Sequence, residues 1–106
     1  MVGSIYLSKI YFTDLSNYKI RPVLVIKELD EEDVICLQLS SKDKKDRISI
    51  SNNNLIDGKI HKDSIIIIPK NFTIHKSTLI KYIGKISDDK LNIVFKTFCK
   101  DLGCNK

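Results

Sequence analysis

The sequence predicts a mainly β fold, a small and strongly bent barrel with one C-terminal α-helix packed on it. Short β-branched apolar runs follow one another at close intervals with turn residues between them, and a single stripe of helical spacing follows Ser87. Many short strands with one terminal helix are typical of such a barrel. The 106 residues contain no internal repeat, low-complexity tract or linker. We therefore expect one domain over residues 1–106, with strands over roughly 9–86.

The first three expected strands lie in the N-terminal half. Residues 9–15 alternate aromatic, aliphatic and polar side chains, and residues 16–19 form a turn cluster. Residues 22–26 form a continuous apolar run, which is typical of a strand buried on both faces. Pro22 stands at its start, where a missing N–H is tolerated. After an acidic turn, residues 34–39 form a third strand that ends at two serines.

Three further strands are expected in the C-terminal half. Residues 47–51 alternate cleanly, as an edge strand does. Residues 64–68 form a fifth strand that Pro69 ends, and residues 81–86 form a sixth. The Asp-Gly pair at residues 57–58 is a turn signal.

The helix is expected over residues 88–102. Ser87 is a suitable N-cap, two aspartates follow in the first turn, and Gly103 suits a left-handed C-terminal residue. The apolar positions fall on one face, which covers either the sheet or a partner. This stripe consists of Leu91, Val94, Phe95, Phe98 and Leu102.

The composition excludes several classes of protein. Hydrophobic residues make up 42% and charged residues 29%, which excludes a disordered or fibrous chain. The longest aliphatic run, residues 65–68, is too short to span a bilayer. The N-terminus carries no secretory signal pattern, so we expect a cytoplasmic protein without membrane contact.

The cysteines and the net charge indicate little by themselves. Cys36, Cys99 and Cys104 form no C-x-x-C pair, which argues against a disulfide framework or a zinc site. We expect Cys36 and Cys99 to be reduced core residues. The chain has 18 basic and 13 acidic residues, a net charge of +5. This charge permits nucleic-acid binding and equally describes a solubilising lysine coat.

One polar constellation suggests chemistry. Arg21 precedes the buried strand, and Ser40 and Ser41 end the next one. Adjacent antiparallel strands place the start of one beside the end of the other, so these side chains converge at one rim of the barrel. A guanidinium with a hydroxyl is suited to grasping a phosphate. The alternative is an ordinary surface arginine beside two turn-capping serines.

An ordered set of motifs over residues 9–102 resembles the MazF/PemK/Kid toxin family. The Arg-Pro pair followed by an aliphatic run is its most recognisable signature. The motifs are YFTDL at 11–15, RPVLVI at 21–26, LSS at 39–41, DSIIII at 63–68, FTI at 72–74 and IGKIS at 83–87.

The resemblance implies an SH3-like barrel that forms a homodimer and is the toxin of a type II toxin–antitoxin system. It implies a metal-independent, sequence-specific endoribonuclease that needs no cofactor. Such toxins cleave single-stranded RNA through attack of a 2′-hydroxyl and inhibit translation and growth. The implied partner is an acidic antitoxin, and DNA is contacted only through it. The family's arginine matches Arg21, and its hydroxyl residue matches Ser40, or Ser41 if the alignment shifts by one.

The general base differs from the family pattern. Some members of the family carry an acidic residue, assigned as the base, at the end of the fifth strand, and the corresponding position here is Pro69, which cannot accept a proton. His75 is the candidate substitute, because imidazole exchanges protons near neutral pH. The alternative for His75 is a solvated loop residue. His61, in a basic loop, is the weaker candidate.

RNA-binding residues are expected on two segments. The basic cluster beside the serines either tracks an RNA backbone or is a solvated loop. Tyrosines near the first turn offer stacking faces for bases. The expected RNA-binding residues are Tyr18, Lys19, Lys42, Lys44, Lys45 and Arg47.

Two alternatives to cleavage remain. One is a barrel of the same family that binds RNA or DNA without cutting it. The other is a protein whose cationic groove mainly receives an acidic partner peptide.

Overall fold

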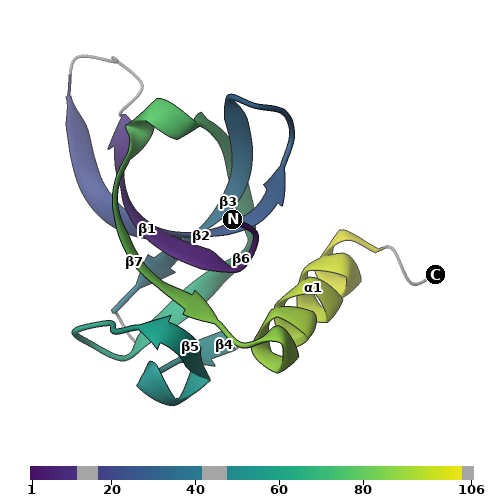
Figure 1. The fold of residues 1–106 in the computed structure, drawn as a ribbon. Coiled ribbons are helices and arrows are strands. Elements are labelled where there is room, and N and C mark those ends of the chain that lie inside the picture. Colours follow the sequence, from purple (N-terminus) through teal and green to yellow (C-terminus); the bar gives the residue numbers. More distant parts are fainter. Residues whose placement is uncertain (12–16, 42–47, 104–106) are drawn as a thin grey trace.

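The computed structural model describes residues 1–11, 17–41 and 48–103, except the side chains of residues 69 and 70 (Figure 1). Within these ranges the chain is mainly β and ends in one α-helix, as expected. The strands are β1 (Ser4–Tyr11), β2 (Tyr18–Glu28), β3 (Asp33–Ser40), β4 (Ile48–Ile50), β5 (Leu55–Gly58), β6 (Ser64–His75) and β7 (Leu79–Ile86), and the helix is α1 (Asp88–Leu102). Two 3₁₀ turns, η1 (Asn52–Asn54) and η2 (Lys76–Thr78), precede β5 and β7.

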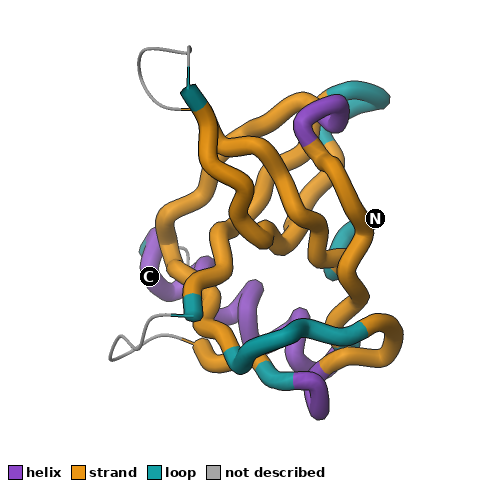
Figure 2. Tube along the Cα trace, turned by 90° about the vertical axis from the view of Figure 1, so that its left-hand side faces the viewer, coloured by secondary structure: helices purple, strands orange, loops and turns teal. Residues whose placement is uncertain are grey.

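The strands form one antiparallel sheet in the order β4-β6-β3-β2-β1-β7-β5. Figure 1 shows this sheet curled round on itself as an incomplete barrel, and in the side view of Figure 2 the strands do not share one plane. The expected bent barrel with a terminal helix is therefore confirmed. β4 lies at an edge of the sheet, as its alternating sequence predicts.

β2 lies at the centre of the sheet and is buried on both faces, as predicted. Val23 and Val25 pack in one apolar cluster, whereas Leu24 and Ile26 pack in the other. Pro22 does not begin the strand, which starts four residues earlier. The pairing of β2 with β3 begins one residue after Pro22, at Val23 opposite Gln38. The missing N–H of the proline thus falls where the central ladder ends.

The predicted limits of two other strands are wrong. β1 begins at Ser4, earlier than predicted. The prediction missed this start because Ser4 and Ser8, although buried, interrupt the apolar pattern that marks a strand. β6 continues through Pro69 to His75. Leu39 lies opposite Ile66 but Leu37 lies opposite Asn71, so β6 contains extra residues between these pairs. A bulge of this kind accommodates a proline inside a strand.

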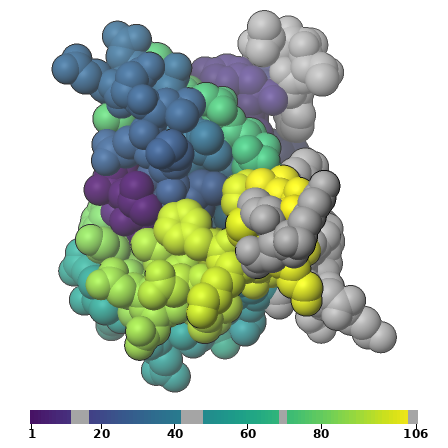
Figure 3. Space-filling view, turned by 90° about the vertical axis from the view of Figure 1, so that its right-hand side faces the viewer, coloured from purple at the N-terminus to yellow at the C-terminus, as the bar shows by residue number. Residues whose placement is uncertain are grey.

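Helix α1 has the predicted bounds and caps. The Ser87 hydroxyl accepts a hydrogen bond from the Lys90 N–H at 3.2 Å, and Gly103 has a left-handed φ of 80°. Val94 is fully buried and Phe98 packs against the same core. Leu102 is 58% exposed, so the sheet covers only part of the apolar stripe. Figure 3 shows α1, in yellow-green to yellow, spread over one face of the molecule.

Cys36 and Cys99 differ in burial and in oxidation state. Cys36 is buried and free, and burial raises the pKa of its thiol to about 12. Cys99 is only partly buried and is disulfide-bonded. The expectation that Cys99 is a reduced core residue is therefore wrong. In the described part of the chain, no helix is long and apolar enough to cross a membrane.

Candidate functional site

A hollow of about 650 Å³ brings together polar residues from β2 and from the end of β3. Arg21, Ser40 and Ser41 all line it. The β2–β3 register explains why: Val23 faces Gln38, and two more residues of the same register bring Arg21 opposite Ser40. The convergence that the sequence predicts at one rim is thus present in the structure.

The Arg21 guanidinium is available to a ligand. Its side chain is exposed, and Nη1 donates a hydrogen bond to the Ile20 carbonyl at 3.1 Å. Among the described residues no carboxylate lies within 4 Å of it. Ser40 is half-buried and Ser41 is exposed. A guanidinium fork with adjacent hydroxyls offers the donor geometry that a phosphate accepts.

The rest of the hollow is basic. Lys59 and Lys62 line it from the segment between β5 and β6, and Lys81 lines it from β7. No Asp or Glu is among the described residues that line it. A concave surface lined by one sign of charge concentrates ligands of the opposite sign. The hollow is therefore suited to a polyanion.

The segment of residues 59–62, which we call the basic segment, is held firmly. The Ile60 N–H donates to Asn52 Oδ1 at 2.8 Å, and Asn52 Nδ2 donates to the Ile60 carbonyl at 3.2 Å. Ile60 itself is only 8% exposed. Figure 2 shows this segment as the loop that joins β5 to β6. The two hydrogen bonds and the burial of Ile60 thus fix the positions of the residues on either side of it.

Tyr82 forms an aromatic part of the rim. Its hydroxyl donates a hydrogen bond to Asp57 Oδ2 at 2.6 Å, and this bond raises the pKa of Tyr82 to about 12. The ring meets the Tyr6 ring edge to face at 5.6 Å between centroids. The hydroxyl therefore stays protonated, and the side chain is 41% exposed. Such a ring suits stacking or hydrogen bonding but not proton abstraction.

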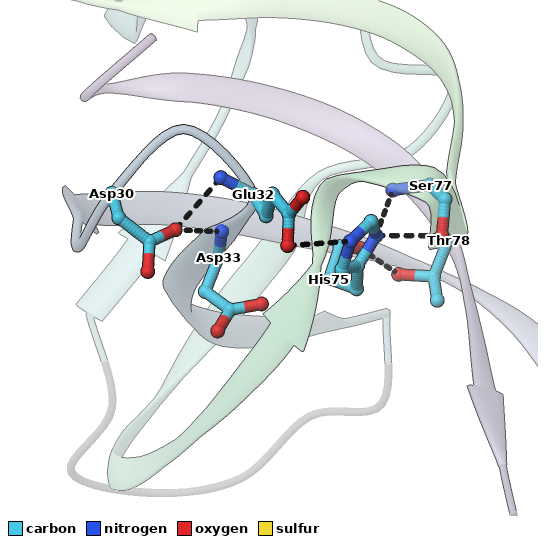
Figure 4. Close-up of polar contacts among 6 residues, drawn as sticks. All are labelled: Asp30, Glu32, Asp33, His75, Ser77 and Thr78. Carbon is cyan, nitrogen blue, oxygen red and sulfur yellow. Dashed lines mark hydrogen bonds and ion pairs between the residues drawn. The ribbon is translucent and has the colours of Figure 1, made fainter.

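His75 does not line the hollow. It pairs with Asp33, at the opposite end of β3 from Ser40. Seven residues of strand separate these ends, about 23 Å at the usual rise. Figure 4 shows what His75 does there: Nδ1 accepts the Ser77 N–H at 3.1 Å and closes η2. Nε2 lies 3.7 Å from Glu32 Oε2. The structure therefore separates His75 from the other expected catalytic residues.

The expected RNA-binding residues are only partly placed. Tyr18 and Lys19 begin β2 and are exposed, but they do not line the hollow. The Tyr18 ring stacks at an angle on Tyr11, with centroids 5.5 Å apart, and Lys9 Nζ lies 4.9 Å above it. The four remaining residues, Lys42, Lys44, Lys45 and Arg47, lie outside the described residues.

Sequence reasoning missed the second wall of the hollow. Lys81 and Tyr82 carry no motif, and the basic segment was recognised as basic but was not linked to Arg21. The turn signal at 57–58 marks a strand end: Gly58, with φ of 75°, closes β5 against β7. The basic segment follows this strand and lines the same hollow as the serines. Among the described residues, no three His, Cys, Asp or Glu side chains group as a metal site.

A family model matches residues 3–101 and describes a PemK-like, MazF-like toxin of a type II toxin–antitoxin system. No curated protein gives a significant match to the chain.

Solved structures share the fold at low sequence identity. A mycobacterial endoribonuclease in complex with its cognate antitoxin has a TM-score of 0.74 and 15% identity, covering 97% of this chain and 92% of that one. The Mycobacterium tuberculosis toxin MazF-mt6 also has a TM-score of 0.74, with 14% identity, covering 94% and 96%. A second mycobacterial endoribonuclease has a TM-score of 0.71 and 14% identity, covering 97% and 90%.

Proposed function

Because the chain belongs to the PemK-like, MazF-like toxin family of type II toxin–antitoxin systems, we propose that it is an endoribonuclease that cleaves single-stranded RNA in the hollow. One observation carries the proposal. Arg21, Ser40 and Ser41 meet in a hollow whose other charged lining residues are lysines. This arrangement supports the binding of a phosphodiester, with the arginine and hydroxyls on the phosphate and the lysines along the flanking backbone.

The proposed reaction is attack of a 2′-hydroxyl on the adjacent phosphate. The 2′-oxygen forms a bond to phosphorus, the bond from phosphorus to the 5′-oxygen breaks, and the products are a 2′,3′-cyclic phosphate and a 5′-hydroxyl. Negative charge grows on the non-bridging oxygens as the new bond forms. Arg21 stabilises this charge more than that of the bound substrate, and Ser40 or Ser41 orients the phosphate. A base takes the proton of the 2′-hydroxyl, and the 5′-oxygen takes a proton from water as it leaves, so the proposed scheme uses no metal and no cofactor.

The proposed partners follow from the same surface. Single-stranded RNA is the substrate, and an acidic antitoxin segment is the inhibitor, since it carries the charge that the hollow attracts. DNA is reached only through the antitoxin. We also propose a homodimer in the cytoplasm. The fold likeness to an endoribonuclease bound to its cognate antitoxin supports the antitoxin in particular.

The test is incubation of the wild type and Arg21→Ala with a long single-stranded RNA in EDTA, mapping every cut end. The wild type should give discrete cuts with cyclic phosphate or 3′-phosphate ends. Loss of the Arg21 donor should slow cleavage by about 10²–10³-fold, as for a donor that stabilises transition-state charge. Lys96→Ala on α1 removes an exposed charge elsewhere and serves as the control. Equal cleavage by Arg21→Ala contradicts the assignment.

The second candidate is a module that binds RNA or DNA without cutting it. The observation that favours it is the lack of a carboxylate among the described lining residues of the hollow. Salt-dependent RNA binding by the folded wild type, free of antitoxin, with the RNA intact after long incubation identifies this candidate.

A further inference from the structure

We propose that His61 is the general base of the cleavage, taking the proton from the attacking 2′-hydroxyl. This inference rests on the proposed endoribonuclease function and deepens it. His61 lines the same hollow as Arg21, Ser40 and Ser41. It lies on the basic segment, which forms the wall that sequence reasoning did not connect with those residues.

The first step is the choice among the groups that line the hollow. Lysine and arginine side chains are ordinarily protonated at neutral pH, and a serine hydroxyl does not ionise there. Tyr82 keeps its proton, because its hydrogen bond to Asp57 raises its pKa to about 12. No carboxylate is among the described lining residues. His61 is then the described lining side chain whose chemical type suits a general base.

The second step is position. His61 follows Ile60, which two hydrogen bonds tie to Asn52. A base on a fixed backbone keeps its distance from the reacting atom, and much of catalysis depends on such fixed geometry. The His61 side chain is exposed, so an RNA strand entering the hollow meets the imidazole without displacing other side chains.

The third step is the charge around the base. Cations from three parts of the chain line the same hollow as His61: Lys59 and Lys62 on the basic segment, Arg21 on β2 and Lys81 on β7. The acidic groups next to these lining residues are Asp63, which follows the basic segment, and Asp57 on β5, which accepts the hydrogen bond of the Tyr82 hydroxyl. The cations hold the flanking phosphates and leave proton transfer to the imidazole.

The other described histidine is occupied differently. His75 Nδ1 accepts the Ser77 N–H, and Nε2 lies beside Glu32 (Figure 4). It therefore closes η2 at the opposite end of β3. His75 provides the competing variant for the test, because the same chemical change is made there outside the hollow.

The proton and electron balance is complete. An imidazole nitrogen of His61 takes the 2′-hydroxyl proton while the 2′-oxygen bonds to phosphorus. The bond to the 5′-oxygen breaks, and that oxygen takes a proton from solvent water. The imidazolium then returns its proton to solvent. No oxidant, reductant or further co-reactant is needed.

The experiment compares wild type, His61→Gln and His75→Gln on a short RNA that contains a cut site mapped for the wild type. Single-turnover cleavage is measured against pH, and affinity is measured on the 2′-O-methyl RNA, which has no attacking hydroxyl. His61→Gln should slow cleavage by about 10²-fold or more, as expected for a lost general base. Its Kd should not change, and its cleavage rate should rise less with pH than that of the wild type.

A second substrate separates base from acid. A 5′-bridging phosphorothiolate has a leaving sulfur that needs no proton, so it relieves a missing acid but not a missing base. His61→Gln should remain slow on this RNA relative to the wild type. Recovery of the wild-type rate assigns His61 to leaving-group protonation and overturns the proposal.

The remaining outcomes are distinct. If the wild type and His61→Gln cut equally, or if His75→Gln loses activity instead, His61 is not the base and the endoribonuclease function stands. If the folded, antitoxin-free wild type cuts no RNA, the proposed function and this inference both fail.

Discussion

The two ends of β3 carry opposite arrangements of charge. At its Ser40 end, Arg21 and the lysines of the hollow have no carboxylate within 4 Å among the described residues. At its Asp33 end, Lys76 lies 3.3 Å from Glu28, and His75 lies 3.7 Å from Glu32. The Ser40 end gathers basic side chains around one hollow, whereas at the Asp33 end Lys76 and His75 each lie beside a glutamate.

The paired end serves the fold. Asp30 Oδ1 accepts the Glu32 N–H at 2.7 Å and the Asp33 N–H at 2.8 Å, which lowers the pKa of Asp30 (Figure 4). These bonds shape the β2–β3 turn. At the hollow, like charges repel one another, and phosphates that enter relieve the repulsion. The charges that stabilise the turns therefore lie at one end of β3, and the charges that are available to a ligand lie at the other end.

The largest expected effect comes from breaking the wall of the hollow at Gly58. A Cβ there would lie 2.0 Å from the Ile83 carbonyl oxygen, and its φ is 75°. Gly58→Ala should reduce the free energy of unfolding in urea by about 3 kcal/mol or more. Gly3→Ala is the control, because Gly3 has a φ of 89° but a Cβ there would lie 3.5 Å from Leu91 Cδ2. It should cost about 1–2 kcal/mol from backbone conformation alone. Equal losses contradict the close approach of β5 to β7.

The second-largest effect is expected from removing the lysines that line the hollow. A triple Lys→Gln variant at residues 59, 62 and 81 should weaken binding of an uncleavable single-stranded RNA. The slope of log K against log salt should become shallower by about 2, since each neutralised phosphate contributes about 0.7 on a single strand. The matched control removes three lysines from α1, at 90, 96 and 100. The same loss of slope in both variants indicates dependence on net charge rather than on the hollow.

The smallest effect is expected at the paired end. Glu28 and Lys76 have side chains that are 44% and 28% exposed, so water screens their attraction. A double-mutant cycle with Glu28→Gln and Lys76→Gln should give a coupling of about 0.2–1 kcal/mol in stability. RNA cleavage should stay at the wild-type rate. A marked loss of cleavage in either variant contradicts the view that the Asp33 end of β3 serves only the fold.

Local patterns in the sequence were sufficient for much of the fold. Ser87 and Gly103 mark the ends of α1 because caps act within one turn of the helix. The apolar run at residues 22–26 indicates burial on both faces because it lacks alternation. Arg21 and Ser40 were predicted to meet because they belong to neighbouring antiparallel strands, whose start and end lie side by side.

The errors arose where pairing between strands determined the structure and the local sequence signal indicated a different one. Pro69 reads as the end of a strand, but a bulge opposite β3 lets β6 continue to His75. The Asp57-Gly58 pair reads as a turn, but it ends a strand paired with β7. The family pattern favours His75 over His61 by its place in the chain, whereas in the structure His75 lies at the opposite end of β3 from Ser40 and His61 lines the hollow.

By itself, the sequence determined the fold class, the family, the helix and the Arg21–serine rim of the hollow. Each depends on residues that are close in the chain or on adjacent strands, so periodicity and motif order carry the information. Only the tertiary structure decided that the basic segment, Lys81 and Tyr82 line the same hollow as Arg21 and the serines. Asn52 and the β5–β7 pairing bring that wall into place. These are contacts between residues distant in the chain, and no local period records them.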